Sequence, residues 1–420
     1  MVPIMRILYL THRLPYAPDR GDRIRAHHTL RTLAASAEVH LFSLVHDEEE
    51  RSRAEALRDL TASVTLAQVP RMRNFVKGAV RLGSTRPLTH SLLDAPAVER
   101  ALATLAAEKR PDVVLAYCSS MARFAGRHPL GHVAFVMDLV DVDSEKWADY
   151  ARTTRGPMGW IYAREARCLA PFEETAARAA HATLVVNDRE RRSLASRVPE
   201  ANVRVVPNGI DLEAFRPTGP PAPDPRVVFC GVLDYRPNER GAIWFATKVW
   251  PLVRAKRPDA RLTLVGRNPT AAVRAVAGSD PSIEVTGAVP DVRPYLWDAA
   301  VGIAPLFEAR GVQNKVLEAV AAGIPMVVTP AVDLGLPSEV RPACLVASDA
   351  GAYAKSVHAL LELTPEGRRR FAESAHLEQL GWRDCLSDLL PILQEAVLAH
   401  KPATQPALTA AAAAALAWTR

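Results

Sequence analysis

The chain has 420 residues, of which 49% are hydrophobic and 23% are charged, and 52 basic against 46 acidic residues leave a net charge of +6. This composition indicates a globular protein of two or three domains and argues against a disordered or fibrous chain. The small basic excess gives no indication of nucleic-acid binding, but it suits an anionic ligand or an anionic membrane surface.

Short apolar, β-branched segments alternate with longer helical patterns along the chain. These segments are apolar on both faces, which is typical of parallel strands covered by helices on both sides. The alternation therefore predicts a doubly wound α/β fold. The first series of predicted strands is 6–11, 39–45, 64–69, 113–118, 133–138, 183–187 and 203–207. The second series is 227–233, 262–265, 283–286, 301–306, 326–329 and 344–346.

A proline-rich segment separates the two series. Residues 216–225 contain five prolines, which fit neither a helix nor a central strand. We therefore expect an N-terminal Rossmann-like domain at 1–215, a linker at 216–225 and a C-terminal Rossmann-like domain at 226–385. A last helix at 386–400 is expected to pack back on the first domain, and an alanine-rich, flexible tail follows at 401–420. Two facing domains of this kind place a ligand cleft at the carboxyl ends of both sheets.

Signals for cofactors and for membrane crossing are missing from the sequence. The five cysteines form no C-x-x-C pair, so neither a zinc cluster nor a redox couple is expected. No window approaches about 18 consecutive apolar residues, so we expect no membrane-spanning helix. The N-terminus shows no secretory signal pattern, which predicts a cytoplasmic protein.

The loop after the first predicted strand carries positive charge. His12, Arg13, Arg20 and Arg23 surround Gly21, just before a predicted helix. A glycine at a helix start lets a phosphate approach the free backbone N–H groups, so Gly21 is a candidate donor-binding residue. An arginine-rich surface turn is the alternative interpretation. The loop has no G-x-G-x-x-G pattern, so nicotinamide and flavin cofactors are not expected.

The strongest signal lies in the second series, at residues 305–329. A strand ends there, a glycine-containing loop turns, and a helix begins near Gln313. The helix start presents unpaired N–H groups and a partial positive charge, to which Lys315 adds a full charge. Glu318 lies one turn further along the same helix face. The cation and the amides suit a diphosphate, and the carboxylate suits two ribose hydroxyls, although K-x-x-E spacing alone is common on solvated helices.

Several segments resemble the retaining GT-B glycosyltransferases of family 4. Residues 182–191 look like the last strand and helix of that family's N-terminal domain, 205–215 contain its P-N-G-[VI]-D connector, and 311–325 resemble its donor-binding helix. Residues 135–147 and 231–238 are similar to the sugar transferases linked to the PEP-CTERM/exosortase exopolysaccharide system of Gram-negative bacteria. The resemblance covers roughly residues 5–395.

The resemblance implies a metal-independent hexosyltransferase that needs no cofactor. It would move a sugar, with retention, from a nucleotide diphosphate sugar to a lipid-linked or oligosaccharide acceptor in exopolysaccharide biosynthesis. Gly311, Lys315, Val316 and Leu317 match the donor-binding segment, and Glu318 matches the glutamate that holds the donor ribose. A nucleotide-sugar epimerase or phosphorylase on the same fold, or a non-catalytic nucleotide-sugar-binding module, are the alternatives.

The sequence departs from the family pattern at two places. Arg310 stands eight residues before Glu318, where the family has a glutamate that acts on the donor sugar. Arg310 is therefore a candidate catalytic residue, together with Lys315, and could bind the diphosphate or an acidic donor sugar.

The second departure follows strand 227–233, where the usual Arg and Lys after Gly231 are missing. The phosphate role then falls to Arg236, Asn238 or Arg240, among which the sequence does not choose. Gly266 and Arg267 resemble the family's loop that meets the base or the phosphate.

Carboxylates mark the acceptor side. Strand 133–138 ends at Asp138, and Asp141 and Asp143 follow. A carboxylate beside the acceptor hydroxyl can act as general base, so Asp138 and Asp141 are candidate catalytic residues. Asp141 to Asp143 also spells D-x-D, the metal motif of GT-A transferases, but this short pattern often occurs by chance. Asp141, Asp143 or Ser144 equally fit the N-cap of the next helix.

Two basic segments mix with apolar and aromatic residues. Residues 70–86 hold five basic residues and no acidic one, and residues 152–167 combine arginines with Trp160, Ile161 and Tyr162. Such segments favour an anionic bilayer surface, here the inner face of the inner membrane, to which the chain would bind peripherally. An ordinary solvated basic helix is the alternative.

Overall fold

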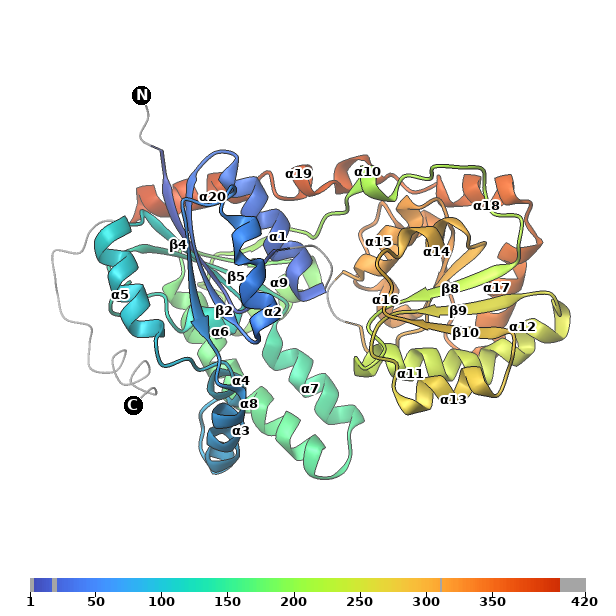
Figure 1. Ribbon diagram of the computed structural model, residues 1–420, viewed down its shortest axis with the longest axis horizontal. Coiled ribbons are helices and arrows are strands. Elements are labelled where there is room, and N and C mark those ends of the chain that lie inside the picture. Colours follow the sequence, from blue (N-terminus) through green and yellow to red (C-terminus); the bar gives the residue numbers. More distant parts are fainter. Residues whose placement is uncertain (1–3, 17–20, 310–311, 401–420) are drawn as a thin grey trace. The chain divides into compact units, whose positions relative to one another are not determined.

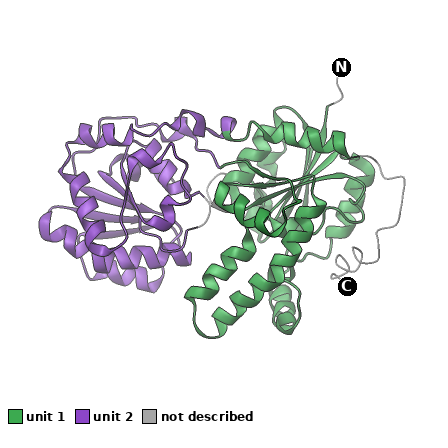
Figure 2. Ribbon diagram, turned by 180° about the vertical axis from the view of Figure 1, so that it is seen from behind, with its two compact units in different colours: residues 1–207, 385–420 green, residues 208–384 purple. Residues whose placement is uncertain are grey.

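The computed structural model describes residues 4–16, 21–309 and 312–400 (Figure 1). It divides into two compact units (Figure 2). Unit 1 is formed by Met1–Pro207 with Cys385–Arg420, and unit 2 by Asn208–Asp384. Each unit contains one wholly parallel sheet, of seven strands in unit 1 and six in unit 2. The predicted doubly wound α/β class is therefore confirmed.

The sheet of unit 1 has the order β3-β2-β1-β4-β5-β6-β7. Its strands are β1 (Arg6–Thr11), β2 (Glu38–Val45), β3 (Ser63–Gln68), β4 (Val113–Tyr117), β5 (Ala134–Val140), β6 (Ala182–Val185) and β7 (Val203–Val205). The strand order reverses between β1 and β4, which are paired neighbours. In open α/β sheets, the crevice beyond such a reversal is where ligands bind.

Helices flank the sheet of unit 1 (Figure 1). They are α1 (Gly21–Ala34), α2 (Glu48–Ser52), α3 (Arg71–Val80), α4 (Leu88–Leu92), α5 (Val98–Lys109), α6 (Ser119–Ala122), α7 (Asp143–Thr153), α8 (Gly156–Ala179), α9 (Asp188–Arg197) and α20 (Leu389–Ala399). The last of these, α20, packs against β4 and β5 although it follows unit 2 in the chain. None of the helices in the described ranges is long and apolar enough to cross a bilayer.

Unit 2 repeats the arrangement with the strand order β10-β9-β8-β11-β12-β13. Its strands are β8 (Arg226–Cys230), β9 (Arg261–Val265), β10 (Ile283–Gly287), β11 (Val301–Ala304), β12 (Met326–Val328) and β13 (Cys344–Val346). Its helices are α10 (Leu212–Phe215), α11 (Arg236–Trp244), α12 (Trp250–Lys256), α13 (Ala271–Gly278), α14 (Arg293–Trp297), α15 (Asn314–Ala321), α16 (Pro330–Asp333), α17 (Ala350–Glu362), α18 (Pro365–Ala372) and α19 (Trp382–Cys385). The strand order reverses between β8 and β11, so their carboxyl ends open on the same crevice.

The two ends of unit 2 lie side by side. The backbone N–H of Ile210 donates to the carbonyl of Leu380 at 2.8 Å, and Ile210 forms an isolated parallel bridge with Gly381. A Cβ atom on Gly209 would lie 2.6 Å from the Cα of Trp382, so only glycine fits there. This contact gives the P-N-G pattern a structural reason.

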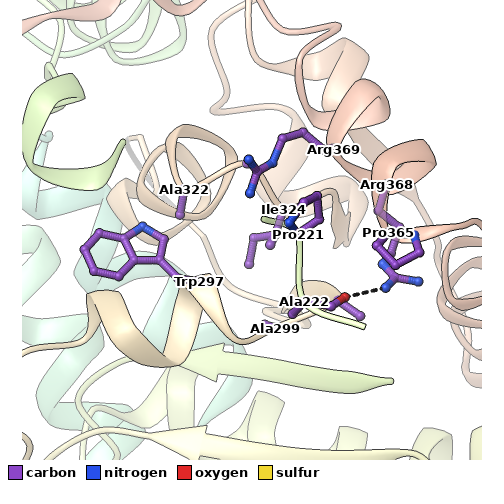
Figure 3. Close-up of a pocket in the computed structure, with 11 residues that line it drawn as sticks. Pro221, Ala222, Trp297, Ala299, Ala322, Ile324, Pro365, Arg368 and Arg369 are labelled. Atoms are coloured by element: carbon purple, nitrogen blue, oxygen red, sulfur yellow. Dashed lines mark hydrogen bonds between the residues drawn. The ribbon is translucent and has the colours of Figure 1, made fainter. Parts of the chain in front are cut away.

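The proline-rich segment is fixed along the surface of unit 2. The Arg368 guanidinium, which is 5% exposed, donates to the carbonyl oxygens of Ala222 at 2.8 Å and Leu363 at 2.7 Å. Arg369 donates to the carbonyl of Gly219 at 3.2 Å. Figure 3 shows the dashed Arg368–Ala222 bond and the ring of Trp297 in the same pocket. Two arginines from α18 therefore hold this segment in place.

Replacing Arg368 with Ala is expected to lower the free energy of unfolding by about 1–3 kcal/mol, because the carbonyl groups of Ala222 and Leu363 lose their charged donor. Urea denaturation followed by tryptophan fluorescence measures this loss. The control is Arg370→Ala, since Arg370 is exposed on the same helix. Equal stability of the two variants would show that the segment does not depend on Arg368.

Candidate active site

The crevice of unit 2 is bordered by the loops that follow β8 and β11. The loop after β8 leads into α11, and the loop after β11 leads into α15. Two hydrogen bonds connect the β8 loop to the end of β9 and the loop after it. The N–H of Gly231 donates to the Val265 carbonyl at 2.9 Å, and the N–H of Leu233 donates to the Arg267 carbonyl at 2.9 Å. The carboxyl ends of β8 and β9 are thus joined into one rim.

Lys315 lies in the first turn of α15 and points towards the β8 loop. Its Nζ donates to Asn238 Oδ1 at 2.5 Å and lies 4.6 Å from the centre of the Phe229 ring. Asn238 is itself fixed, because its Nδ2 donates to the Val232 carbonyl at 2.9 Å. Desolvation lowers the pKa of Lys315 to about 8, against the opposing effects of Cys230 and Glu318. A lysine held over an aromatic ring beside a helix start is suited to an anionic ligand.

Glu318 lies one turn beyond Lys315 on α15. Desolvation raises the pKa of its carboxyl group to about 7, and the charge of Lys315 opposes this shift. Both side chains are half-buried. Burial thus brings the pKa values of the two groups close to each other. Both groups lie beside the crevice where the strand order reverses, and this combination marks a candidate functional site.

Two glycines allow close packing of the loops around Lys315. A Cβ atom on Gly231 would lie 2.7 Å from Asn238 Nδ2 and 2.9 Å from Lys315 Nζ. A Cβ atom on Gly266, where φ is +158°, would lie 1.7 Å from the carbonyl oxygen of Gly231. The backbone of Gly231 therefore packs directly against Lys315, Asn238 and Gly266, and side chains at these two glycine positions would displace these neighbours.

The connector between the units reaches α15 as well. Asn208 Nδ2 donates to Asn314 Oδ1 at 3.4 Å, and Asp211 accepts the N–H of Ala214 at 3.0 Å to cap α10. Helix α10 packs on α15. The P-N-G-I-D segment thus positions the start of the helix that carries Lys315.

In unit 1, Asp138 is fully buried at the end of β5 and forms an ion pair. Its carboxylate accepts hydrogen bonds from Arg25 Nε at 2.9 and 3.2 Å, and Arg25 Nη1 donates to the carbonyl of Pro207 at 3.1 Å. Arg25 belongs to α1 and is 2% exposed. The ion pair therefore connects α1 with β5, and Arg25 also connects α1 with Pro207.

The residues after Asp138 are strained and hydrogen-bonded. Val140 ends β5 and Cys118 directly follows β4, and both have φ of +68°, a conformation that residues with a side chain rarely adopt. Asp143 accepts a hydrogen bond from Ser119 Oγ at 2.8 Å. Strand ends with positive φ redirect the chain, here towards Asp141 and α7.

Two family descriptions match most of the chain between them. "Glycosyltransferase Family 4" matches residues 23–214, and "Glycosyl transferases group 1" matches residues 224–363. The chain is a glycosyltransferase of group 1 and family 4. No curated protein sequence matches it.

Solved structures share the GT-B fold of this glycosyltransferase. Anabaena Alr3699/HepE in complex with UDP and glucose has a TM-score of 0.64 at 13% identity, over 93% of this chain and 100% of that chain. An α,α-trehalose-phosphate synthase (UDP-forming) from Burkholderia vietnamiensis has a TM-score of 0.61 at 13% identity, over 94% and 98% of the two chains. At these identities the likeness concerns the fold alone.

The glycosyltransferase brings some of the predicted donor residues together and leaves others apart. Lys315 and Asn238 are hydrogen-bonded, and Gly266 contacts the neighbouring loop. Arg240, by contrast, forms an ion pair with Glu308. Arg236 begins α11 and Arg267 follows β9, and both are half-buried.

Other predicted donor residues lie in the core or outside the described ranges. Val316 and Leu317 are fully buried among the apolar residues of unit 2, so their side chains hold α15 on the sheet. Each residue along a helix is turned by about 100° from the one before, so neither side chain points in the direction of Lys315. Gly21 begins α1. Arg310 and Gly311 lie outside the described residues.

Sequence reasoning missed two contributors to this site. Phe229 lies beneath Lys315, and Asn208 contacts the first residue of α15. The sequence pattern identifies Phe229 only as part of a strand, and no local signal distinguishes it from the other strand residues. Asn208 was used only as part of the connector pattern, although an Asn between Pro and Gly is itself a polar group at a turn.

The alternative interpretation of Asp141, Asp143 or Ser144 as the N-cap of α7 is wrong. The residue at the cap is Val142, and no side chain caps the helix from that position. Glu173 of α8 replaces the cap, because its carboxylate accepts the Ser144 N–H at 3.0 Å and also the Ser144 hydroxyl. Within the ranges that the structure describes, Asp141 and Asp143 are not part of any group of three His, Cys, Asp or Glu side chains that could hold a metal ion.

Proposed function

We propose that this glycosyltransferase binds a nucleotide diphosphate sugar in unit 2 and transfers the sugar, with retention of configuration, to a lipid-linked or oligosaccharide acceptor. The observation that carries the proposal is the position of Lys315 at the start of α15, where its ammonium group lies against Asn238 and the backbone of Gly231. HepE, which has the same fold, is in complex with UDP and glucose. The similarity of residues 135–147 and 231–238 to exosortase-linked transferases supports a role in exopolysaccharide synthesis.

The proposed reaction breaks the bond between the anomeric carbon and the diphosphate oxygen. The nucleotide diphosphate leaves with the electron pair, and the acceptor hydroxyl forms the new bond. Lys315 and the N-terminal amides of α15 stabilise the negative charge that develops on the leaving group, without a metal ion. Glu318 accepts hydrogen bonds from the ribose hydroxyls. Asp141 is the remaining candidate for the base that takes the acceptor proton, since Arg25 already binds Asp138.

Release of free nucleotide diphosphate tests the proposal. The enzyme is incubated with UDP-glucose, GDP-mannose and related donors, and the released diphosphate and the sugar products are measured. A transferase releases the diphosphate slowly to water and faster with acceptor. An epimerase yields an isomeric donor and a phosphorylase yields a sugar phosphate, so both products would contradict the proposal. A binding module releases nothing.

Gly231→Val should weaken the binding of UDP at least about tenfold, because the added carbon atoms occupy the space next to Lys315 Nζ. Isothermal titration with UDP measures the affinity, and circular dichroism checks the fold. Gly278→Val is the matched control, since a Cβ atom there meets nothing within 4 Å. If both variants bind UDP equally well, the donor lies elsewhere.

The pH dependence of kcat/KM should be bell-shaped, with its maximum between about 7 and 8. The pKa of Lys315 is lowered to about 8, so its charge and its hold on the diphosphate are lost as the pH rises through that value. The pKa of Glu318 is raised to about 7, so its carboxylate is lost as the pH falls through that value. Lys315→Arg should move the alkaline limb to higher pH, because arginine stays protonated. An unchanged alkaline limb in this variant would contradict the assignment to Lys315.

A further inference from the structure

Helix α3 carries its polar face inward and its apolar face outward. Its buried positions are Asn74 and Gly78. The exposed large apolar side chains are Met72, Phe75, Val76 and Val80, with 80%, 68%, 60% and 81% of their surface in contact with solvent. They follow the spacing i, i+3, i+4 and i+8, which places them in one stripe. A helix on a protein surface normally buries such a stripe.

Polar contacts fix this orientation. Asn74 Nδ2 donates to the carbonyl oxygens of Leu92 at 3.0 Å and Asp94 at 2.6 Å, and Lys77 forms an ion pair with Asp94. A Cβ atom on Gly78 would meet Leu92 Cδ2 at 3.5 Å. The inward face therefore fits its neighbours as it is, and turning the helix over would break these contacts.

A buried arginine attaches α3 and the loop after it to the long helix α8. Arg164, which is 4% exposed, donates to the carbonyl oxygens of Arg81, Leu82 and Arg86 at 3.0, 2.8 and 2.8 Å. Glu165 accepts the backbone N–H groups of Leu88 at 2.7 Å and Thr89 at 2.8 Å. Figures 1 and 2 both show α3 and the α7–α8 hairpin extending from the same end of unit 1. The hydrogen bonds of Arg164 and Glu165 thus hold α3 and its apolar stripe in a fixed position on α8.

The stretch of chain that contains α3 is basic, and Asp94 at its end is paired with Lys77. No acidic residue lies between Asp59 and Asp94, whereas this stretch contains Arg71, Arg73, Lys77, Arg81 and Arg86. Arg71 and Arg73 are exposed on α3 itself. Met158 and Trp160, near the start of α8, add further exposed apolar surface.

We propose that α3 binds an anionic lipid bilayer, with its apolar stripe at the boundary of headgroups and acyl chains and its arginines on lipid phosphates. Amphipathic helices with basic flanks bind such surfaces through buried apolar area and charge attraction together. A second copy of the chain fits less well, because a symmetric contact would bring these like charges together. The inference rests on the proposed function in one respect: a lipid-linked acceptor would give the docking its purpose.

Vesicle flotation of the full chain tests the inference. The wild type should bind vesicles of phosphatidylcholine with about 30% phosphatidylglycerol at least tenfold better than pure phosphatidylcholine vesicles, and salt should weaken the binding. A variant with Met72→Ser, Phe75→Ser and Val80→Ser should lose at least tenfold of this binding. The control carries Leu252→Ser and Leu334→Ser, which change exposed apolar residues of unit 2, and should bind as the wild type does.

Each of three results would overturn the inference. The wild type binds anionic and neutral vesicles equally, or the stripe variant binds anionic vesicles as well as the wild type does. The third is a dimer of the wild type in light scattering, with the stripe variant monomeric. Equal thermal midpoints of the two serine variants show that lost binding is not lost folding. UDP binding separates this inference from the proposed function. Lys315→Met should keep vesicle binding while losing UDP, and the stripe variant should keep UDP while losing vesicles.

Discussion

Lys315→Met should lower kcat by about 100- to 1000-fold with little change in stability. The ammonium group lies at the start of α15, over Phe229 and against Asn238, so it is positioned where charge on a leaving diphosphate would develop. Methionine is unbranched and of similar length, and it removes the ammonium group with its charge and its hydrogen bond to Asn238. Steady-state assays of donor turnover, with the thermal midpoint as a check on folding, measure the effect.

Lys355→Met is the matched control for this experiment. Lys355 is exposed on α17 of the same unit, and its replacement should leave kcat within about twofold of the wild type, as surface substitutions generally do. A Lys315→Met enzyme that turns over at the control's rate would remove Lys315 from the mechanism. A loss confined to KM would instead indicate equal binding of substrate and transition state.

Asp138→Asn should lower the free energy of unfolding of unit 1 by about 3–5 kcal/mol, because it leaves the Arg25 guanidinium buried without its counter-charge. Urea denaturation measures the loss. Replacing both partners, as Arg25→Met with Asp138→Leu, should recover a large part of it, since no buried charge then remains.

The exposed pair of Arg58 and Glu55 provides the control for this prediction. Both side chains are more than two-thirds exposed, so Glu55→Gln should change stability by at most about 1 kcal/mol. If Asp138→Asn keeps its stability but loses turnover, Asp138 acts in the reaction, and the ion pair with Arg25 is a feature of the resting enzyme only.

The strands of the fold could be predicted because parallel strands that are buried on both faces appear in the sequence as short, continuous apolar runs. Strand β1 lies at Arg6–Thr11, as the apolar run predicts. Errors arose where an apolar residue lies outside a strand. The run 227–233 continues through Leu233, which is buried, yet β8 ends at Cys230, and Leu233 lies in the loop that bonds to Arg267.

The site could be predicted only as far as its local signals reach. Lys315 and Glu318 are one helical turn apart, so their neighbourhood follows from the helical period. Asp138 and Arg25 are 113 residues apart, and Arg368 and Ala222 are 146 apart, so nothing local pairs them. The same holds for α3, whose outward apolar face depends on contacts with Leu92 and Asp94 that the helix pattern does not contain.

The contact between Gly209 and Trp382 makes unit 2 a closed insert. When the first and last residues of a domain lie close together, the domain can be replaced by another with the same spacing of its ends. The rest of the protein then keeps its structure. Residues 208–384 could therefore be exchanged as a cassette between enzymes of this architecture. Such an exchange would replace the proposed donor site while α3 and the rest of unit 1 stay as they are.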